Sequence, residues 1–116
     1  MSKIRIYHNT RCSKSRETLA LLENEQHDID IIDYLKTPPT PDELNVILQQ
    51  LKMRPRQLLR SKETLYKELE LDNDKLSDKQ LIETMCANPK LIERPIVIKD
   101  NQAIIGRPPE AVLNIL

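Results

Sequence analysis

Cys12 is the residue of this sequence best placed to do chemistry, because basic side chains surround it. Arg11, Lys14 and Arg16 lie close to it in the chain, and His8 precedes it. The thiolate is the nucleophilic form of cysteine, and nearby positive charge brings a cysteine pKa from about 8.5 to roughly 3.5–7.5. The sequence therefore predicts that Cys12 is a reactive nucleophile.

The other interpretation of Cys12 is a small buried apolar residue, the usual role of a free cysteine. Its polar neighbours Arg11, Ser13 and Lys14 would be hard to bury, which favours the reactive role. Ser15 stands where the two-cysteine motif of thioredoxin-like proteins has its second cysteine. A hydroxyl can support a thiolate but cannot form a disulfide with it, so a reductive cycle would need a thiol from elsewhere.

The elements around Cys12 follow from the local pattern. Residues 4–7 alternate as a half-buried strand does, and His8, Asn9 and Thr10 are turn residues. From Ser13 onwards the spacing of apolar residues becomes helical. Cys12 should thus lie at a helix N-terminus, where unpaired N–H groups and the macrodipole stabilise an anion.

A second strand is predicted over residues 26–34, and strand, helix and strand in this order imply a parallel crossover. Thr40, Pro41 and Glu43 form a helix start with a capping box, and Ser77 with Gln80 repeats this signature. Short helices are expected between these two starts. The middle of the chain, about residues 41–88, is therefore predicted to be helical, with Cys86 a structural residue on an apolar helix face.

Strands return near the end of the sequence. Residues 95–99 and 102–105 read as a hairpin around Asp100 and Asn101. Gly106 is the only glycine, which suggests a place where backbone freedom or close approach is needed. Residues 110–116 read as a closing helix, with these side chains available for the core: Val112, Leu113 and Leu116.

Composition narrows the class of protein. The 116 residues suit one domain over residues 1–116, and 18 basic side chains balance 18 acidic ones. This balance argues against nucleic-acid or membrane binding but allows a local basic pocket. The start does not read as a signal peptide, no apolar run suits a membrane span, and two cysteines make no disulfide framework. We expect a cytoplasmic monomer.

The predicted order is a β-α-β half, a helical insertion and a β-β-α half, which is the α/β order of a thioredoxin or glutaredoxin fold with a four-stranded mixed sheet. Four motifs make the resemblance specific: YHNTRCSKSR at 7–16, LLR at 58–60, NPKLIERPIVI at 88–98 and GRPPE at 106–110. Together they resemble the glutaredoxin-linked arsenate reductase (ArsC) family over nearly the whole chain. The sequence is most similar to the short bacterial members.

The resemblance implies roles for individual residues. Cys12 matches the nucleophile of the family, and the residues that match its oxyanion-binding arginines are Arg60, Arg94 and Arg107. A guanidinium is a permanently charged, planar donor fork that complements a tetrahedral oxyanion. Taken alone, any one of these arginines would be assigned to the surface or to an ion pair.

Three further residues match family positions. His8 and Ser15 match residues that support the thiolate, and Pro95 matches the proline that thioredoxin-like folds place opposite the cysteine, commonly after a cis peptide bond. The sequence departs from many members at Thr10, where they have proline, and at Ser13 and Lys14, where plasmid-type enzymes have a Gly-Thr pair.

The activity that the resemblance implies is reduction of arsenate to arsenite. Glutathione would be the co-substrate and glutaredoxin the partner, with no metal and no bound cofactor. Two alternatives share the fold: a regulator like the Spx proteins, which bind RNA polymerase, and a glutaredoxin-like thiol transferase. Ser15 argues against the two-cysteine switch of the regulators, and the three arginines favour the reductase over both alternatives.

Overall fold

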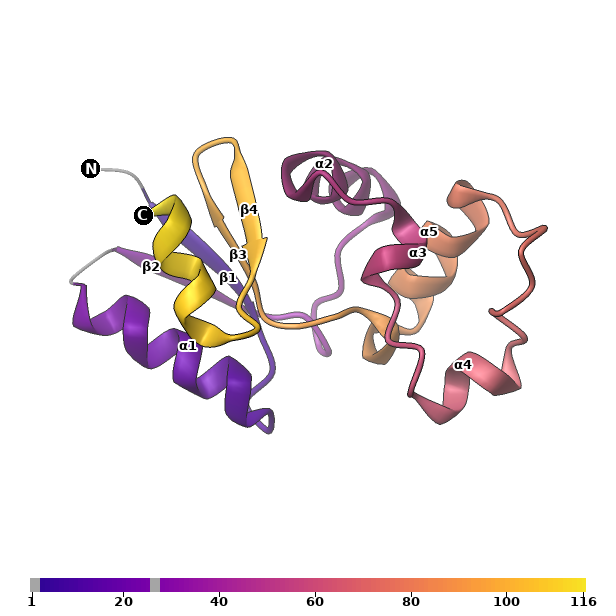
Figure 1. Cartoon of the computed structure of the whole chain (residues 1–116), viewed down its shortest axis with the longest axis horizontal. Helices are drawn as coiled ribbons and strands as arrows, with labels where there is room; N and C mark the ends of the chain where they lie inside the picture. Colours follow the sequence, from indigo (N-terminus) through magenta and orange to yellow (C-terminus); the bar gives the residue numbers. More distant parts are fainter. Residues whose placement is uncertain (1–2, 26–27) are drawn as a thin grey trace. The chain divides into compact units, whose positions relative to one another are not determined.

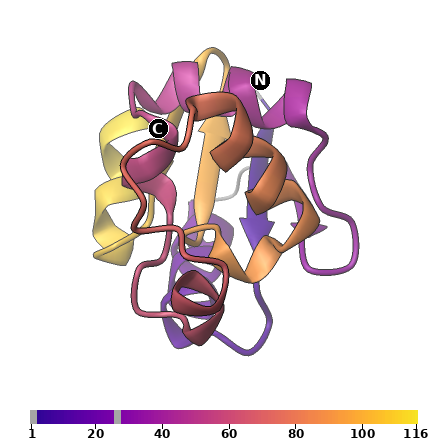
Figure 2. The same cartoon turned by 90° about the vertical axis from the view of Figure 1, so that its right-hand side faces the viewer.

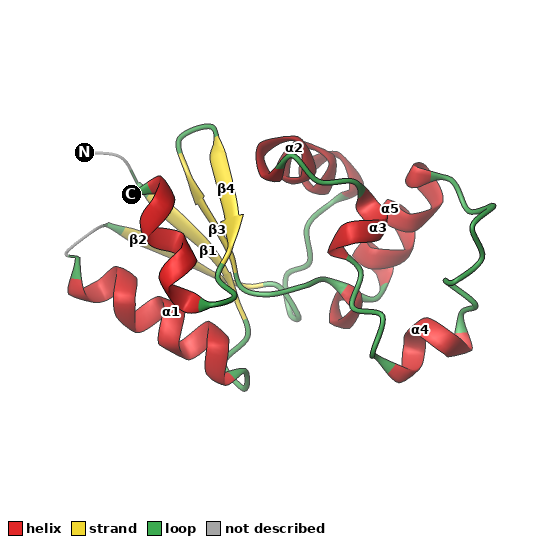
Figure 3. Ribbon diagram, viewed as in Figure 1, coloured by secondary structure: helices red, strands yellow, loops and turns green. Residues whose placement is uncertain are grey.

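The N-terminal and C-terminal parts of the chain together form a four-stranded mixed sheet. The computed structural model describes residues 3–25 and 28–116. The strands are β1 (Ile4–His8), β2 (Ile29–Asp33), β3 (Ile96–Lys99) and β4 (Gln102–Ile105), in the order β2-β1-β3-β4 (Figure 3). β1 pairs with β2 in parallel and with β3 antiparallel, so the sheet is the predicted mixed thioredoxin-like one.

The predicted strands occur close to their expected bounds. β1 extends one residue beyond the prediction, to His8, and β2 is shorter than residues 26–34. Residues 26 and 27 of that prediction lie outside the described residues. The β3–β4 hairpin turns at Asp100, whose φ of 57° is left-handed, a conformation that aspartate tolerates better than most residues.

Helix α1 (Ser13–Asn24) and the 3-10 helix η2 (Pro109–Ile115) pack side by side on one face of this sheet (Figure 1). The core beneath them is fully buried and apolar: Ile4, Ile6, Leu22, Val97 and Val112. At about 25 cal/mol per Å² of buried apolar surface, these side chains supply much of the drive to fold this part of the chain.

The closing helix differs from the prediction. It is a 3-10 helix with three residues per turn, so side chains three apart share a face. Pro109 and Val112 are buried and Ile115 packs against the core, whereas Leu113 is 45% exposed. The expectation that Leu113 belongs to the core was wrong, because it assumed the wider spacing of an α-helix.

The chain divides into two compact units, residues 1–37 with 94–116, and residues 38–93. The second unit is helical: α2 (Pro41–Leu51), α3 (Pro55–Leu58), α4 (Thr64–Glu68), α5 (Asp78–Ala87) and the 3-10 turn η1 (Pro89–Leu91). α5 packs against α2 and α3 (Figure 1, Figure 2). Both predicted capping boxes are present, Thr40 with Glu43 and Ser77 with Gln80. Within the described residues, no helix is long and apolar enough to cross a membrane.

Candidate active site

Cys12 lies at the junction between β1 and α1, as the sequence predicted. It is the N-cap residue of α1, with an extended backbone (φ −94°, ψ 122°), and its carbonyl accepts the first helical bond from the Arg16 N–H at 3.0 Å. Its own N–H donates to the Asn9 carbonyl at 3.0 Å, which closes the turn. The side chain of Cys12 therefore projects from the positive end of a 12-residue helix.

The pKa of the Cys12 thiol is lowered although its partial burial acts in the opposite direction. Burial disfavours the thiolate, but the backbone N–H of Ser15, the guanidinium of Arg94 and the backbone N–H of Lys14 together outweigh it. Among the described residues, the Cys12 side chain makes no capping hydrogen bond to α1. The N–H groups of Lys14 and Ser15 therefore act on the sulfur as oriented dipoles. The net effect shifts the Cys12 thiol toward the thiolate, the charge state that a nucleophile requires.

Ser15 is fully buried and its hydroxyl is held by the loop before Cys12. The Ser15 Oγ lies 2.7 Å from the His8 Nδ1 and accepts the Asn9 N–H at 3.0 Å. Because a hydroxyl has a single proton, the His8 tautomer decides whether that proton points to the imidazole. Ser15 and His8 therefore fix the turn on which Cys12 stands.

His8 is buried at the end of β1, next to Asp33 of β2 in the strand register. Burial lowers the pKa of His8, the Asp33 carboxylate opposes this, and the Arg16 guanidinium lowers it further. The net direction is downward, so the neutral imidazole is favoured at neutral pH. Asp33 could not be singled out from the sequence, because its proximity to His8 depends on the strand pairing.

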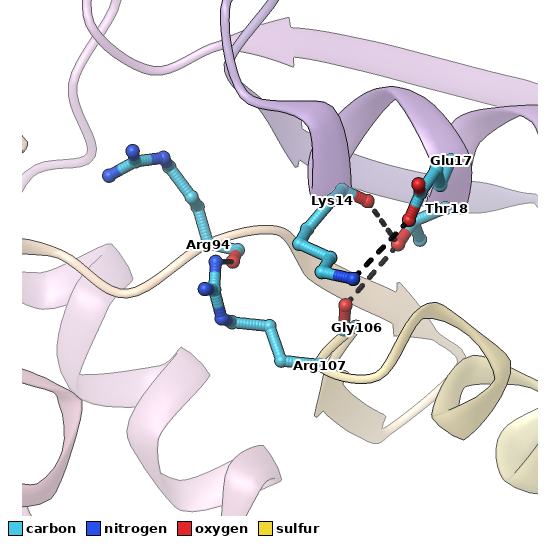
Figure 4. A network of polar contacts seen from close by, with 6 residues as sticks. All are labelled: Lys14, Glu17, Thr18, Arg94, Gly106 and Arg107. Carbon is cyan, nitrogen blue, oxygen red and sulfur yellow. Dashed lines mark hydrogen bonds and ion pairs between the residues drawn. The ribbon is translucent and has the colours of Figure 1, made fainter.

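Arg94 lies just before β3 and Arg107 just after β4, and these two segments meet beside α1 (Figure 4). The Arg107 Nη1 donates to the Arg94 carbonyl at 3.3 Å, and the Gly106 N–H donates to the Pro95 carbonyl at 2.9 Å. The Arg94–Pro95 peptide bond is cis, as predicted, and so is Arg107–Pro108. The structure thus brings Cys12, His8, Ser15, Arg94 and Arg107 into one compact unit.

Lys14, a departure from the plasmid-type pattern, directs its side chain along α1. Its Nζ lies 3.7 Å from the Glu17 carboxylate, and both side chains are about half exposed (Figure 4). The contribution of Lys14 to the Cys12 pKa comes from its backbone N–H.

Arg60 belongs to the helical unit, where two carboxylates hold it. Its Nη1 donates to Glu63 at 3.1 Å and its Nε lies 3.6 Å from Glu93, with the Arg60 side chain 21% exposed. The backbone around it is fixed by the Arg60 N–H, which donates to Leu91 at 2.8 Å. Sequence reasoning identified Arg60 but not its acidic partners.

Cys86 has the opposite character to Cys12. Burial raises the pKa of its thiol, and the charge of Glu43 raises it further. A thiol of this kind is a poor nucleophile at neutral pH. Within the described residues, His, Cys, Asp and Glu side chains form no group that could hold a metal ion.

Comparison with known proteins assigns the family. A family model described as the ArsC family matches residues 7–115. The chain belongs to the ArsC family. The family resemblance and the fold predicted from the sequence are both confirmed.

Relatives within the ArsC family align over almost their full length. An arsenate reductase from Haemophilus influenzae is 51% identical and covers 96% of this chain and 97% of its own. YfgD of Escherichia coli, described as uncharacterized, is 50% identical over 98% of this chain and 97% of its own. The solved structure of an arsenate reductase from Vibrio cholerae superposes with a TM-score of 0.97 at 53% identity, covering 99% of this chain and 98% of its own.

Replacing Arg94 by methionine should raise the pKa of Cys12, because the side chain keeps its bulk but loses the charge that favours the thiolate. The pKa is measured from the pH dependence of iodoacetamide alkylation in a Cys86→Ser background, which leaves Cys12 as the only thiol. Arg11→Met is the matched control, since Arg11 is exposed and does not contribute to the shift. An unchanged Cys12 pKa in Arg94→Met would contradict the assignment.

Replacing Ser15 by alanine should lower the free energy of unfolding by about 1–3 kcal/mol, because the buried His8 Nδ1 and Asn9 N–H both lose their hydroxyl partner. Urea denaturation measures this change. Ser13→Ala, at the exposed start of the same helix, should change it by less than about 0.5 kcal/mol. Equal losses in the two variants would mean that the Ser15 hydroxyl does not hold the turn.

Proposed function

We propose that this chain reduces arsenate to arsenite, with the Cys12 thiolate as nucleophile and with glutathione and glutaredoxin as electron donors. The observation that carries the proposal is the thiol of Cys12, which has a lowered pKa, lies at the N-terminus of α1 and is acted on by Arg94. Membership of the ArsC family and its arsenate reductase relatives support arsenate as the substrate.

In the first step the thiolate attacks pentavalent arsenic, a sulfur–arsenic bond forms, and one arsenate oxygen leaves as hydroxide or, after protonation, as water. Arg94 and Arg107 supply guanidinium donors to the remaining oxygens, which carry the developing negative charge. Arg60 is proposed as a third oxyanion ligand, from its place in the LLR motif. Guanidinium groups are suited to arsenate, which is an anion at neutral pH.

In the second step the thiolate of glutathione attacks the Cys12 sulfur. A disulfide bond forms between the two sulfurs, and the sulfur–arsenic bond breaks with its electron pair remaining on arsenic, which becomes trivalent. Glutaredoxin then attacks the glutathione sulfur of this mixed disulfide and releases Cys12 as a thiolate. Ser15 at the position of a second cysteine supports an external thiol for this step.

The test is the consumption of NADPH, coupled through glutathione reductase, glutathione and glutaredoxin, in the presence of arsenate. Cys12→Ser should abolish arsenate-dependent turnover, whereas Cys86→Ser should retain it, since the Cys86 thiol is only partly exposed and has a raised pKa. Arg60→Ala should lower kcat/KM by about 10²–10³, the usual cost of removing an oxyanion donor. Arg54→Ala removes an exposed arginine of the same unit and should have little effect.

Absence of arsenate turnover by folded protein, while Cys12 still titrates as a thiolate of low pKa, would reject arsenate as the substrate. Turnover of a glutathionylated peptide without arsenate would then favour the thiol transferase.

The carboxylates beside Arg60 should weaken its attraction for an anion. Glu63→Gln removes the closer of the two negative charges, and we expect the KM for arsenate to fall about two- to five-fold, as 0.5–1 kcal/mol would give. Initial rates across arsenate concentrations measure KM. Glu68→Gln neutralises an exposed carboxylate of the same unit and serves as the control. A rise in KM for Glu63→Gln would instead mean that Glu63 holds Arg60 in its binding position.

A further inference from the structure

Gly106 and Thr18 meet at a contact that leaves no space for another carbon atom. A Cβ on residue 106 would lie 2.6 Å from Thr18 Oγ1, 3.0 Å from Thr18 Cγ2 and 2.9 Å from Pro95 Cγ. Gly106 does not have a positive φ, so it is not needed for a left-handed turn. The single glycine of this chain therefore serves close approach between α1 and the segment that follows β4.

Thr18 completes the contact from the helix side. It is fully buried, and its hydroxyl donates to the Lys14 carbonyl at 2.8 Å and reaches the Gly106 carbonyl at 3.4 Å (Figure 4). One hydroxyl proton is shared between these two carbonyls. Thr18 thereby joins the first turns of α1 to the residue that precedes Arg107.

The contact between Thr18 and Gly106 is connected to Cys12 through a series of neighbouring interactions. Gly106 binds the Pro95 carbonyl through its N–H at 2.9 Å, and Arg107 binds the Arg94 carbonyl at 3.3 Å. Arg94 in turn acts on Cys12, which caps the helix that carries Thr18. The distance between α1 and residue 106 consequently affects the distance between the sulfur and the cations.

We propose that Thr18 and Gly106 are positioning residues, whose contact sets how closely the Arg94 and Arg107 segments approach the N-terminus of α1. The part of this inference that concerns arsenate rests on the function proposed above. A Cβ at residue 106 would push the segment after β4 away from Thr18 of α1 and from Pro95 by several tenths of an ångström. Neither Thr18 nor Pro95 has a long flexible side chain that could move aside. Misplacement of about 1 Å can reduce catalysis by about 10²-fold.

The experiment compares Gly106→Ala, the double variant Gly106→Ala with Thr18→Ala, and Thr18→Val, all in the Cys86→Ser background. Four quantities are measured: the Cys12 pKa from the pH dependence of iodoacetamide alkylation, the kcat for arsenate, the KM for arsenate, and the thermal unfolding midpoint. Thr84→Val is the matched control, because its hydroxyl makes the same bond to the carbonyl four residues earlier, at 2.8 Å, but in α5.

Gly106→Ala should raise the Cys12 pKa and raise the KM for arsenate about tenfold, because the cations move away from the sulfur. The double variant removes two of the three atoms that the new methyl would meet, so it should restore part of both losses. Thr18→Val changes the volume little and removes only the hydroxyl, so it should shift both quantities less, and it is informative even if Gly106→Ala does not fold. Thr84→Val should leave both unchanged.

The proposal is overturned if Gly106→Ala or, where that variant is unfolded, Thr18→Val lowers the unfolding midpoint while the Cys12 pKa and the arsenate KM stay at wild-type values. That result would assign the contact to packing alone. A raised Cys12 pKa in a protein whose parent does not turn over arsenate would support the positioning role and reject the proposed substrate. The alkylation readout thus separates failure of this inference from failure of the proposed function.

Discussion

The stability of one negative charge, on the sulfur of Cys12, is the physical constraint on which the rest of the site depends. Partial burial penalises the thiolate, and the penalty must be offset by groups that are themselves held in place. The amides of the first turn of α1 do this without a net charge, and Arg94 does it with one. Both contributions depend on the orientation of α1, so the reactivity of the cysteine is a property of the packing around that helix.

The packing of α1 has an apolar part and a polar part. Leu22 packs in the core with Val97 and Val112. Ser15 and Thr18 are also fully buried. Ser15 binds the turn after β1, and Thr18 binds Gly106. Buried hydroxyls cost free energy unless they are bonded, and both of these are. The apolar part therefore attaches the helix to the sheet, and the polar part fixes its N-terminal end relative to the loops that carry the site.

Much of this arrangement could be predicted from the sequence. The change of period after residue 12 placed Cys12 at a helix start, and the capping boxes at Thr40 and Ser77 are present as expected. Local signals of this kind lie within a few residues of one another, so a single sequence contains them.

What could not be predicted depends on distant pairings or on a small change in helix geometry. The carboxylates on Arg60, the effect of Asp33 on His8 and the contact of Thr18 with Gly106 all require the folded chain. Thr18 did have a local signal, since it shares a helical face with Ser15 and Leu22, but a threonine there reads as a surface residue. Leu113 was misplaced because α-helical and 3-10 periods diverge within a single turn.

The sheet order has a consequence for when the reactive thiol arises during folding. β1 and β3 are neighbours, yet Ile4 pairs with Lys99, so a loop of roughly ninety residues must close before they meet. Pairing at such sequence separation is slow, because chain entropy is lost before contacts compensate for it. Until β3 docks, Cys12 lacks the contribution of the Arg94 guanidinium, and only the amides of α1 favour its thiolate. The full lowering of the Cys12 pKa therefore arises only with the completed sheet.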